Sequence, residues 1–161
     1  MKKNSILVAV MIVTIAMSGC STSEDTESSS ASTDKAHDMN AEALAKYVEL
    51  EQSSIPQIMA KSPGVYSEMS VKGSFEDPSD EQLAPGEHAV MFYDFYANPV
   101  DWPSAIAALD AQRADLNSAC KTAIFPAMRN AGISGPLGAQ FSYDDGTSEF
   151  GPFWRHTCTE Y

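Results

Sequence analysis

Basic residues are scarce in this chain. Only 10 Lys and Arg stand against 22 Asp and Glu among 161 residues, so the formal net charge is −12 at pH 7. Nucleic-acid phosphates and anionic lipid surfaces are bound through Lys and Arg side chains. We therefore expect no nucleic-acid partner, and we expect that charge does not hold the protein to a membrane.

Long hydrophobic runs are missing as well. The uncharged, mostly apolar stretch over residues 6–17 is shorter than the about 20 apolar residues that span a bilayer, and no second stretch of that length follows. It begins after Lys2 and Lys3 and leads into small residues and Cys20. This order is typical of an export signal. Two alternatives to the lipoprotein signal described next are an ordinary secretory signal and an uncleaved membrane helix.

Residues 17–20, Met-Ser-Gly-Cys, resemble the lipobox of bacterial lipoproteins, with Met17 where Leu is most usual. The resemblance implies that Cys20 is acylated on its sulfur and that residues 1–19 are removed as a signal peptide. Two acyl chains give stable anchoring where one does not. The expected location is the extracytoplasmic face of the cell membrane, with the membrane itself as a partner through the lipid.

Cysteine is also rare, with three residues in the chain. If Cys20 carries lipid, Cys120 and Cys158 remain as a pair in an oxidising compartment, where a disulfide persists. Their bond would close a loop of about 38 residues and contribute about 4 kcal/mol in the chain-entropy model. The alternative is two buried thiols that act as small hydrophobic groups. A redox-catalytic pair is not expected, because the sequence has no Cys-x-x-Cys motif.

Residues 20–40 are rich in Ser, Thr and acidic residues and contain almost nothing to bury. Such a composition cannot offset the entropy of ordering, so we expect a disordered tether. Glycosylation of its Ser and Thr residues is the alternative role. Residues 41–161 then form one globular domain.

Apolar periodicity divides this domain into six elements. Asn40 is expected to cap a first helix, which Pro56 kinks or divides, and Asp101 to cap a second helix that Pro126 ends or kinks. Strands are predicted over residues 65–75, 88–97, 137–144 and 149–159. The order α-β-β-α-β-β favours an α+β two-layer sandwich, in which two helices lie on one face of a four-stranded antiparallel sheet.

Several motifs of the domain resemble a family of uncharacterised lipoprotein domains from Gram-positive bacteria, chiefly actinobacteria. They are Lys46-Tyr47-Val48-Glu49, Glu51-Gln52-Ser53-Ser54-Ile55-Pro56, Tyr96-Ala97-Asn98-Pro99-Val100-Asp101, Leu109-Asp110-Ala111-Gln112, Phe125-Pro126-Ala127-Met128 with the preceding Cys120, and Ala131-Gly132. Two segments depart from the sequence pattern of this family, namely the acidic residues 76–87 and the pair Gly151-Pro152. The resemblance implies no activity and no catalytic residues.

Motifs for catalysis, phosphate binding, dinucleotide binding and zinc proteases are absent from the sequence. Asp144-Asp145-Gly146 predicts a hairpin turn rather than a calcium loop. His88 and His156 lie in predicted strands without ligand spacing, so we expect no metal and no cofactor. An enzyme is the less favoured class.

Aromatic residues concentrate in two of the predicted strands. They belong mainly to the core, but an open sheet face would let them bind a peptide, a glycan or an envelope protein. Tyr93, Phe95 and Phe153 are the candidate ligand-binding residues. The sequence therefore favours a membrane-anchored binding or accessory domain. An envelope enzyme or inhibitor, or a structural spacer without a site, are the alternatives.

Overall fold

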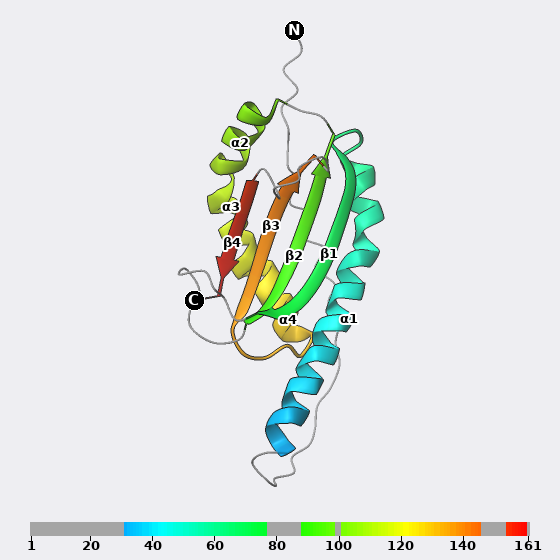
Figure 1. Ribbon diagram of the computed structural model, residues 1–161, viewed down its shortest axis with the longest axis vertical. Helices are drawn as coiled ribbons and strands as arrows, with labels where there is room; N and C mark the ends of the chain where they lie inside the picture. Colours follow the sequence, from blue (N-terminus) through cyan, green and yellow to red (C-terminus); the bar gives the residue numbers. More distant parts are fainter. Residues whose placement is uncertain (1–30, 77–87, 99–100, 146–153, 161) are drawn as a thin grey trace.

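The computed structural model describes residues 31–76, 88–98, 101–145 and 154–160. They form an α+β fold in which helices and strands share one hydrophobic core (Figure 1). The elements in chain order are α1 (Ala31–Lys61), β1 (Tyr66–Glu76), β2 (His88–Ala97), α2 (Trp102–Ala111), α3 (Arg113–Ala119), the π-helical turn η1 (Cys120–Ile124), α4 (Phe125–Asn130), β3 (Leu137–Asp144) and β4 (Trp154–Thr159). The α+β class predicted from the sequence is confirmed.

The sheet is mixed, so the prediction of an antiparallel sheet is wrong. Its strand order is β1-β2-β3-β4. The pairs β1–β2 and β3–β4 are antiparallel, but β2 and β3 are parallel. The reason is the helical connection from α2 to α4, which carries the chain back along the sheet so that β3 starts at the same end as β2. Periodicity locates strands but does not give their direction.

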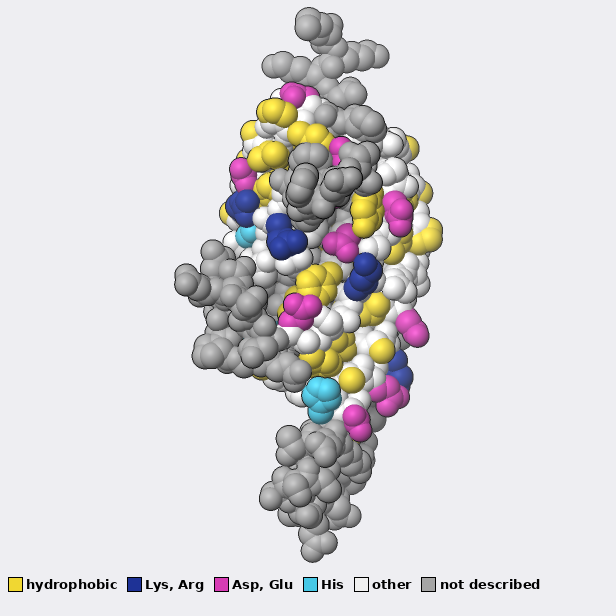
Figure 2. All heavy atoms as spheres, in the orientation of Figure 1, with side chains coloured by type: hydrophobic (Ala, Val, Ile, Leu, Met, Phe, Trp, Pro, Cys, Tyr) yellow, Lys and Arg dark blue, Asp and Glu magenta, His cyan; other side chains and the backbone are white. Residues whose placement is uncertain are grey.

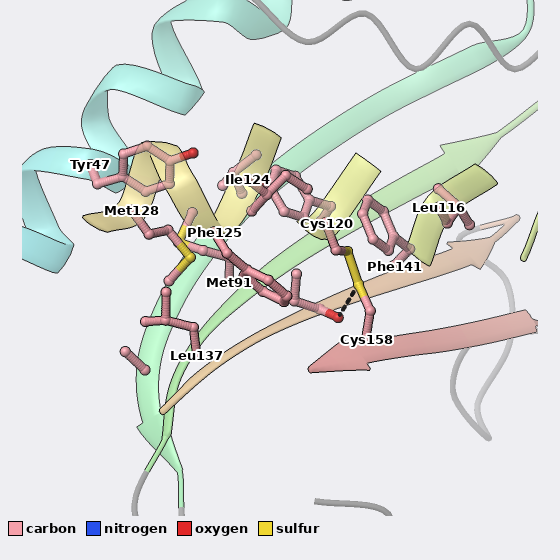
Figure 3. Close-up of a cluster of buried hydrophobic side chains, with 14 of the residues drawn as sticks. Tyr47, Met91, Leu116, Cys120, Ile124, Phe125, Met128, Leu137, Phe141 and Cys158 are labelled. Carbon is pink, nitrogen blue, oxygen red and sulfur yellow. Dashed lines mark hydrogen bonds between the residues drawn. A yellow bond between two sulfur atoms is a disulfide. The ribbon is translucent and has the colours of Figure 1, made fainter. Parts of the chain in front are cut away.

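One face of this sheet is buried across all four strands. Val71 pairs with Tyr93, Tyr93 with Phe141, and Phe141 with His156, so these four residues share that face. The described contacts of α1 and α3 with the sheet fall on the same face, which we call the helix face. Figure 3 shows side chains from α1, η1 and α4 packed against β2 and β3 there.

The first helix starts earlier than predicted, at Ala31 instead of after Asn40, and it runs without a break through Pro56. Asn40 therefore has another role than an N-cap. Its side-chain Nδ2 donates to the carbonyl of Ser134 at 3.2 Å, and its Oδ1 accepts from the Ser134 N–H at 2.8 Å. This pair ties α1 to the turn before β3, which sequence periodicity could not show. The 31–40 stretch assigned to the tether belongs to α1.

The second helical region is divided where the sequence suggested one helix with a late kink. The chain breaks at Gln112, between α2 and α3. The turn η1 then precedes Pro126, which has no N–H to offer the helix. The N–H of Phe125 bonds to the carbonyl of Cys120, five residues back. This wider turn brings the helix to Pro126 with Cys120 and Ile124 both buried.

The strand bounds agree closely with the sequence patterns. β2 and β3 have the predicted limits, and β1 lies one residue later at each end. β4 is described from Trp154 onward. The start of the last predicted strand lies outside the described residues, as do the signal peptide, Cys20 and residues 21–30.

Gly73 lets α1 approach β1 closely, which predicts a cost for adding a side chain. A Cβ at Gly73 would lie 2.8 Å from Val48 Cγ2 and 3.0 Å from Leu44 Cγ. We expect Gly73→Ala to lower the free energy of unfolding by about 1–3 kcal/mol, because α1 must shift. Urea unfolding measures this, with Lys72→Ala, whose exposed side chain lies on the other face, as the matched control. Equal stability of both variants would contradict the close packing.

Candidate functional site

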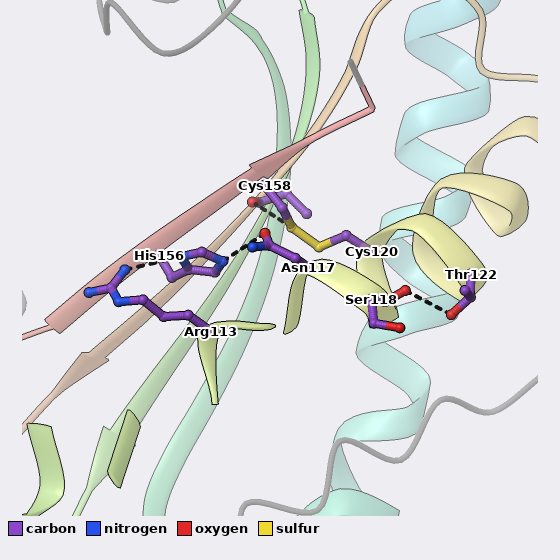
Figure 4. The surroundings of a disulfide bond; sticks show 8 residues. Arg113, Asn117, Ser118, Cys120, Thr122, His156 and Cys158 are labelled. Carbon is purple, nitrogen blue, oxygen red and sulfur yellow. Dashed lines mark hydrogen bonds between the residues drawn. A yellow bond between two sulfur atoms is a disulfide. The ribbon is translucent and has the colours of Figure 1, made fainter. Parts of the chain in front are cut away.

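The predicted cysteine pair lies at disulfide distance between η1 and β4. The Cα atoms of Cys120 and Cys158 are 6.6 Å apart, and the residues are 38 positions apart in sequence. Both are buried in the core, Cys120 completely. Figure 4 shows the bond as the bridge between the helical segment and the outermost strand. Because solvent does not reach it, this pair serves as a structural cross-link rather than a reactive dithiol.

Arg113, at the start of α3, connects the helices to β4. Its Nε donates to Asp110 Oδ1 at 2.9 Å, and its Nη1 donates to the carbonyl of Arg155 at 3.3 Å. The guanidinium also lies 4.7 Å from the centre of the Trp154 ring, and the Trp154 indole N–H donates to Asp110 at 2.9 Å. The structure shows a side chain bonded to two elements at once.

His156 is the most constrained titratable group of this network. Its Nδ1 lies 3.1 Å from Arg113 Nη1, and its Nε2 lies 3.0 Å from Asn117 Oδ1. Arginine can only donate, so Nδ1 accepts and Nε2 carries the proton that goes to Asn117. Arg113 and Asn117 are four residues apart on α3 and approach the ring from the same helix (Figure 4).

The pKa of His156 is lowered from its ordinary value, first by burial and then by the charge of Arg113. The imidazole is thus held neutral, with both ring nitrogens in hydrogen bonds. A catalytic base or a metal ligand needs a free lone pair on such a ring. The arrangement therefore suits the docking of α3 on β4 and not proton transfer.

Metal-ligating side chains do not gather in the described part of the chain. No group of three or more His, Cys, Asp or Glu there could hold an ion. His88 lies at the start of β2. His156 lies in β4, with both ring nitrogens in the hydrogen bonds described above. The turn after Asp145, the candidate hairpin, lies outside the described residues.

Tyr93 and Phe95, two of the candidate ligand-binding residues, lie on the helix face. Tyr93 is buried and stacks on Phe141 with ring centres 5.2 Å apart. Phe95 is half-buried and stacks on Tyr143 at 4.7 Å. Both rings therefore belong to the core stack of the sheet. Phe153, the third candidate, lies outside the described residues, and the ligand-binding role of the three stays a prediction.

The phenol of Tyr93 is part of a short buried relay. It donates to the oxygen of Tyr47 in α1, and the Tyr47 hydroxyl donates to the carboxylate of Glu51. Burial is the main cause that raises the pKa of both phenols, with the nearby Glu51 charge adding to it. Both hydroxyls therefore stay protonated and satisfied inside the core. This relay joins α1 to the central strand.

The opposite sheet face carries a second aromatic pair that the sequence analysis did not single out. Phe92 and Tyr96 alternate with Tyr93 and Phe95 along β2, so they point away from the helix face, and both are only half-buried. We call this side the open face. Figure 2 shows hydrophobic side chains there among Lys, Arg, Asp and Glu. Asp94, which lies between the two rings on the same side, is the sequence signal that could have identified it.

Charged residues of β1 and β2 surround this aromatic pair. Lys72 lies directly opposite Phe92 in the neighbouring strand, and Ser70 lies opposite Asp94 and donates to its carboxylate at 3.4 Å. Gln140 of β3 flanks Phe92 on the other side. The result is a surface of mixed polar and aromatic groups, the composition that protein-binding patches use.

His156 predicts an acid-sensitive loss of stability. The groups that face its ring are Arg113 and Asn117 of α3, with Asp110 of α2 beyond the arginine. Protonation of His156 Nδ1 would make it a donor that faces the donor Nη1 of Arg113, so the hydrogen bond between them would be lost. The pKa of His156 is lower in the native state than in the unfolded state. The contribution of neutral His156 to stability is therefore complete above the ordinary pKa of about 6.5, and it is lost as the pH falls through the native pKa.

We expect His156→Gln, which keeps a donor for Asn117 but cannot titrate, to show a weaker pH dependence of unfolding below neutrality. The difference should correspond to at most one proton per molecule. Urea unfolding from pH 8 to pH 4.5 measures it. Parallel curves for the two proteins would show that His156 is not the group responsible.

Comparison with known proteins gives no functional information about this site. No family model, curated protein or solved structure matches the chain. The resemblance to Gram-positive lipoprotein domains therefore stays a prediction. No helix among the described residues is long and apolar enough to cross a membrane.

Proposed function

We propose that this protein is a lipid-anchored binding domain on the extracytoplasmic face of the cell membrane. Acylated Cys20 would hold it to the bilayer, and the open face would contact an envelope protein. The observation that carries the binding role is the partial exposure of Phe92 and Tyr96 on a strand whose other face is core. Exposed aromatic groups among charged neighbours favour a protein contact.

The finer layering of the fold is part of this proposal. We propose that α1 and the α2–α4 segment form one layer on the helix face, as in a two-layer sandwich. The support is that α1 approaches the sheet at Gly73 and Tyr93, while α3 approaches it at His156, and these residues share one face. Such a layer would leave the open face available to a partner.

The alternatives fit the described residues less well. An enzyme would need a titratable group with a free lone pair in a cleft, but both ring nitrogens of His156 are engaged. A spacer would need no aromatic groups at its surface, but Phe92 and Tyr96 are partly exposed. The acidic net charge of −12 suits solubility in the envelope.

The anchoring part of the proposal predicts a change of location. We expect Cys20→Ala to move most of the protein from the membrane fraction to the soluble fraction, because the acyl chains are lost. Ser21→Ala is the matched control and should stay in the membrane. Fractionation of cells that express each variant measures the change. Retention of Cys20→Ala in the membrane would reject the lipid anchor.

The binding part predicts crosslinks from one face only. A photo-reactive amino acid at Lys72, exposed on the open face, should crosslink a defined envelope protein in intact cells. The same group at Ala107, exposed on α2, should not. Comparing the two positions shows whether the neighbour binds through the open face rather than lying anywhere near the protein. Equal crosslinking from both positions, or none from Lys72, would contradict binding through the open face.

A further inference from the structure

Each edge strand of the sheet has one backbone carbonyl that accepts a hydrogen bond from a helix side chain. The edge strands are β1 and β4. At β1, Gln52 of α1 donates its Nε2 to the carbonyl of Val71 at 2.9 Å, and at β4 Arg113 donates its Nη1 to the carbonyl of Arg155 at 3.3 Å. Covering an edge with a helix is a common way to prevent pairing with another chain. Figure 1 shows α1 beside β1 and β4 as the outermost strand on the other side.

The direction of the backbone groups of β4 follows from two hydrogen bonds. The N–H of Glu160 bonds to the carbonyl of Leu137 at 3.2 Å, so the even-numbered residues of β4 turn toward β3. Arg155 and Thr157 then turn their N–H and C=O away from the sheet. The bond from Arg113 to the Arg155 carbonyl, at 3.3 Å, agrees with this direction.

The middle of the β4 edge is open in the part of the chain that the structure describes. Arg113 occupies the carbonyl of Arg155, but no described group bonds to the backbone N–H and C=O of Thr157. The strand has no Pro, no Lys and no register shift, which are the features that usually protect an edge. Thr157 is β-branched and partly exposed, so it suits pairing with another strand.

One exposed cation, Arg155, lies on this edge strand of an acidic molecule. The chain has only three arginines, and all of them lie at β4. Arg155 is exposed on the strand itself, and Arg113 contacts Arg155 and His156 from the helix face. Arg129 reaches Glu160, the residue after the strand. Arg113 and Arg129 form ion pairs with Asp110 and Glu160, so the exposed Arg155 is the cation that favours an acidic partner at this edge.

We propose that β4 accepts an extended acidic segment of a partner protein as a fifth strand of the sheet. The segment would bond to the N–H and C=O of Thr157 and place a carboxylate beside the Arg155 guanidinium. This mode, strand addition, gives affinity through the backbone and specificity through alternate side chains. The inference rests on the proposed binding function and names the partner class and the edge that it uses.

The test uses the full-length chain in detergent and a synthetic probe, an acetylated and amidated seven-residue peptide of alternating Glu and Val. A peptide with Lys in place of Glu is the charge control. Thr157→Pro removes the outward N–H without removing a bond of the ladder. Thr157→Val, the matched control, keeps that N–H and the branched side chain.

We expect the Glu peptide to shift the backbone amide resonances of Arg155 and Thr157 and to bind at least tenfold more tightly than the Lys peptide. Thr157→Pro should weaken its binding at least tenfold, while Thr157→Val changes it less than threefold. Arg155→Glu should reverse the preference between the two peptides.

Three results would overturn the inference. They are an unchanged affinity of Thr157→Pro, shifts that map to α1 or the open face, and self-association of the chain through β4, which would make a second copy the occupant. If no peptide binds but Lys72 still crosslinks a partner, the strand addition fails while the proposed binding function stands. If neither occurs, both fail.

Discussion

Burial of the helix face of β2 is the constraint on which the rest of the structure depends. β2 lies between β1 and β3, and Met91 and Tyr93 on this face are both buried. The strand is covered by α1 from before it in sequence and by the η1–α4 segment from after it (Figure 3). The hydrophobic effect drives this burial, and the parallel pairing of β2 with β3 requires a crossover connection between them.

That crossover determines where the second helical segment meets β4. Because β3 runs parallel to β2, the following strand returns along its outer side, beside α3 and η1. Two kinds of contact then hold β4 in place: the buried cysteine pair and the polar network of Arg113 and His156. The two act together, since Cys158 and His156 are alternate residues on the same face of one strand. The outer edge of β4 remains as the part of the sheet that α1 does not cover.

Several features could be predicted from local patterns. The limits of β2 and β3 follow from apolar and aromatic periodicity bounded by turn residues, and the cysteine pair was predicted from an even number of cysteines in an oxidising compartment. Other features could not. Both faces of β2 are aromatic, so alternation alone could not show that Tyr93 is core while Phe92 is only half-buried. The role of Asn40, which bonds to Ser134 rather than capping a helix, involves two residues that are 94 positions apart.

The sequence by itself determined which segments become helices and strands, because hydrophobic period and turn residues are local properties. It also contains the signal pattern that predicts export and lipidation at Cys20. Only the tertiary structure decided the direction of β3, the face on which each aromatic ring lies, and the neutral state of His156 beside Arg113. These depend on contacts between residues distant in sequence, whose energies arise only when the sheet and helices have packed together.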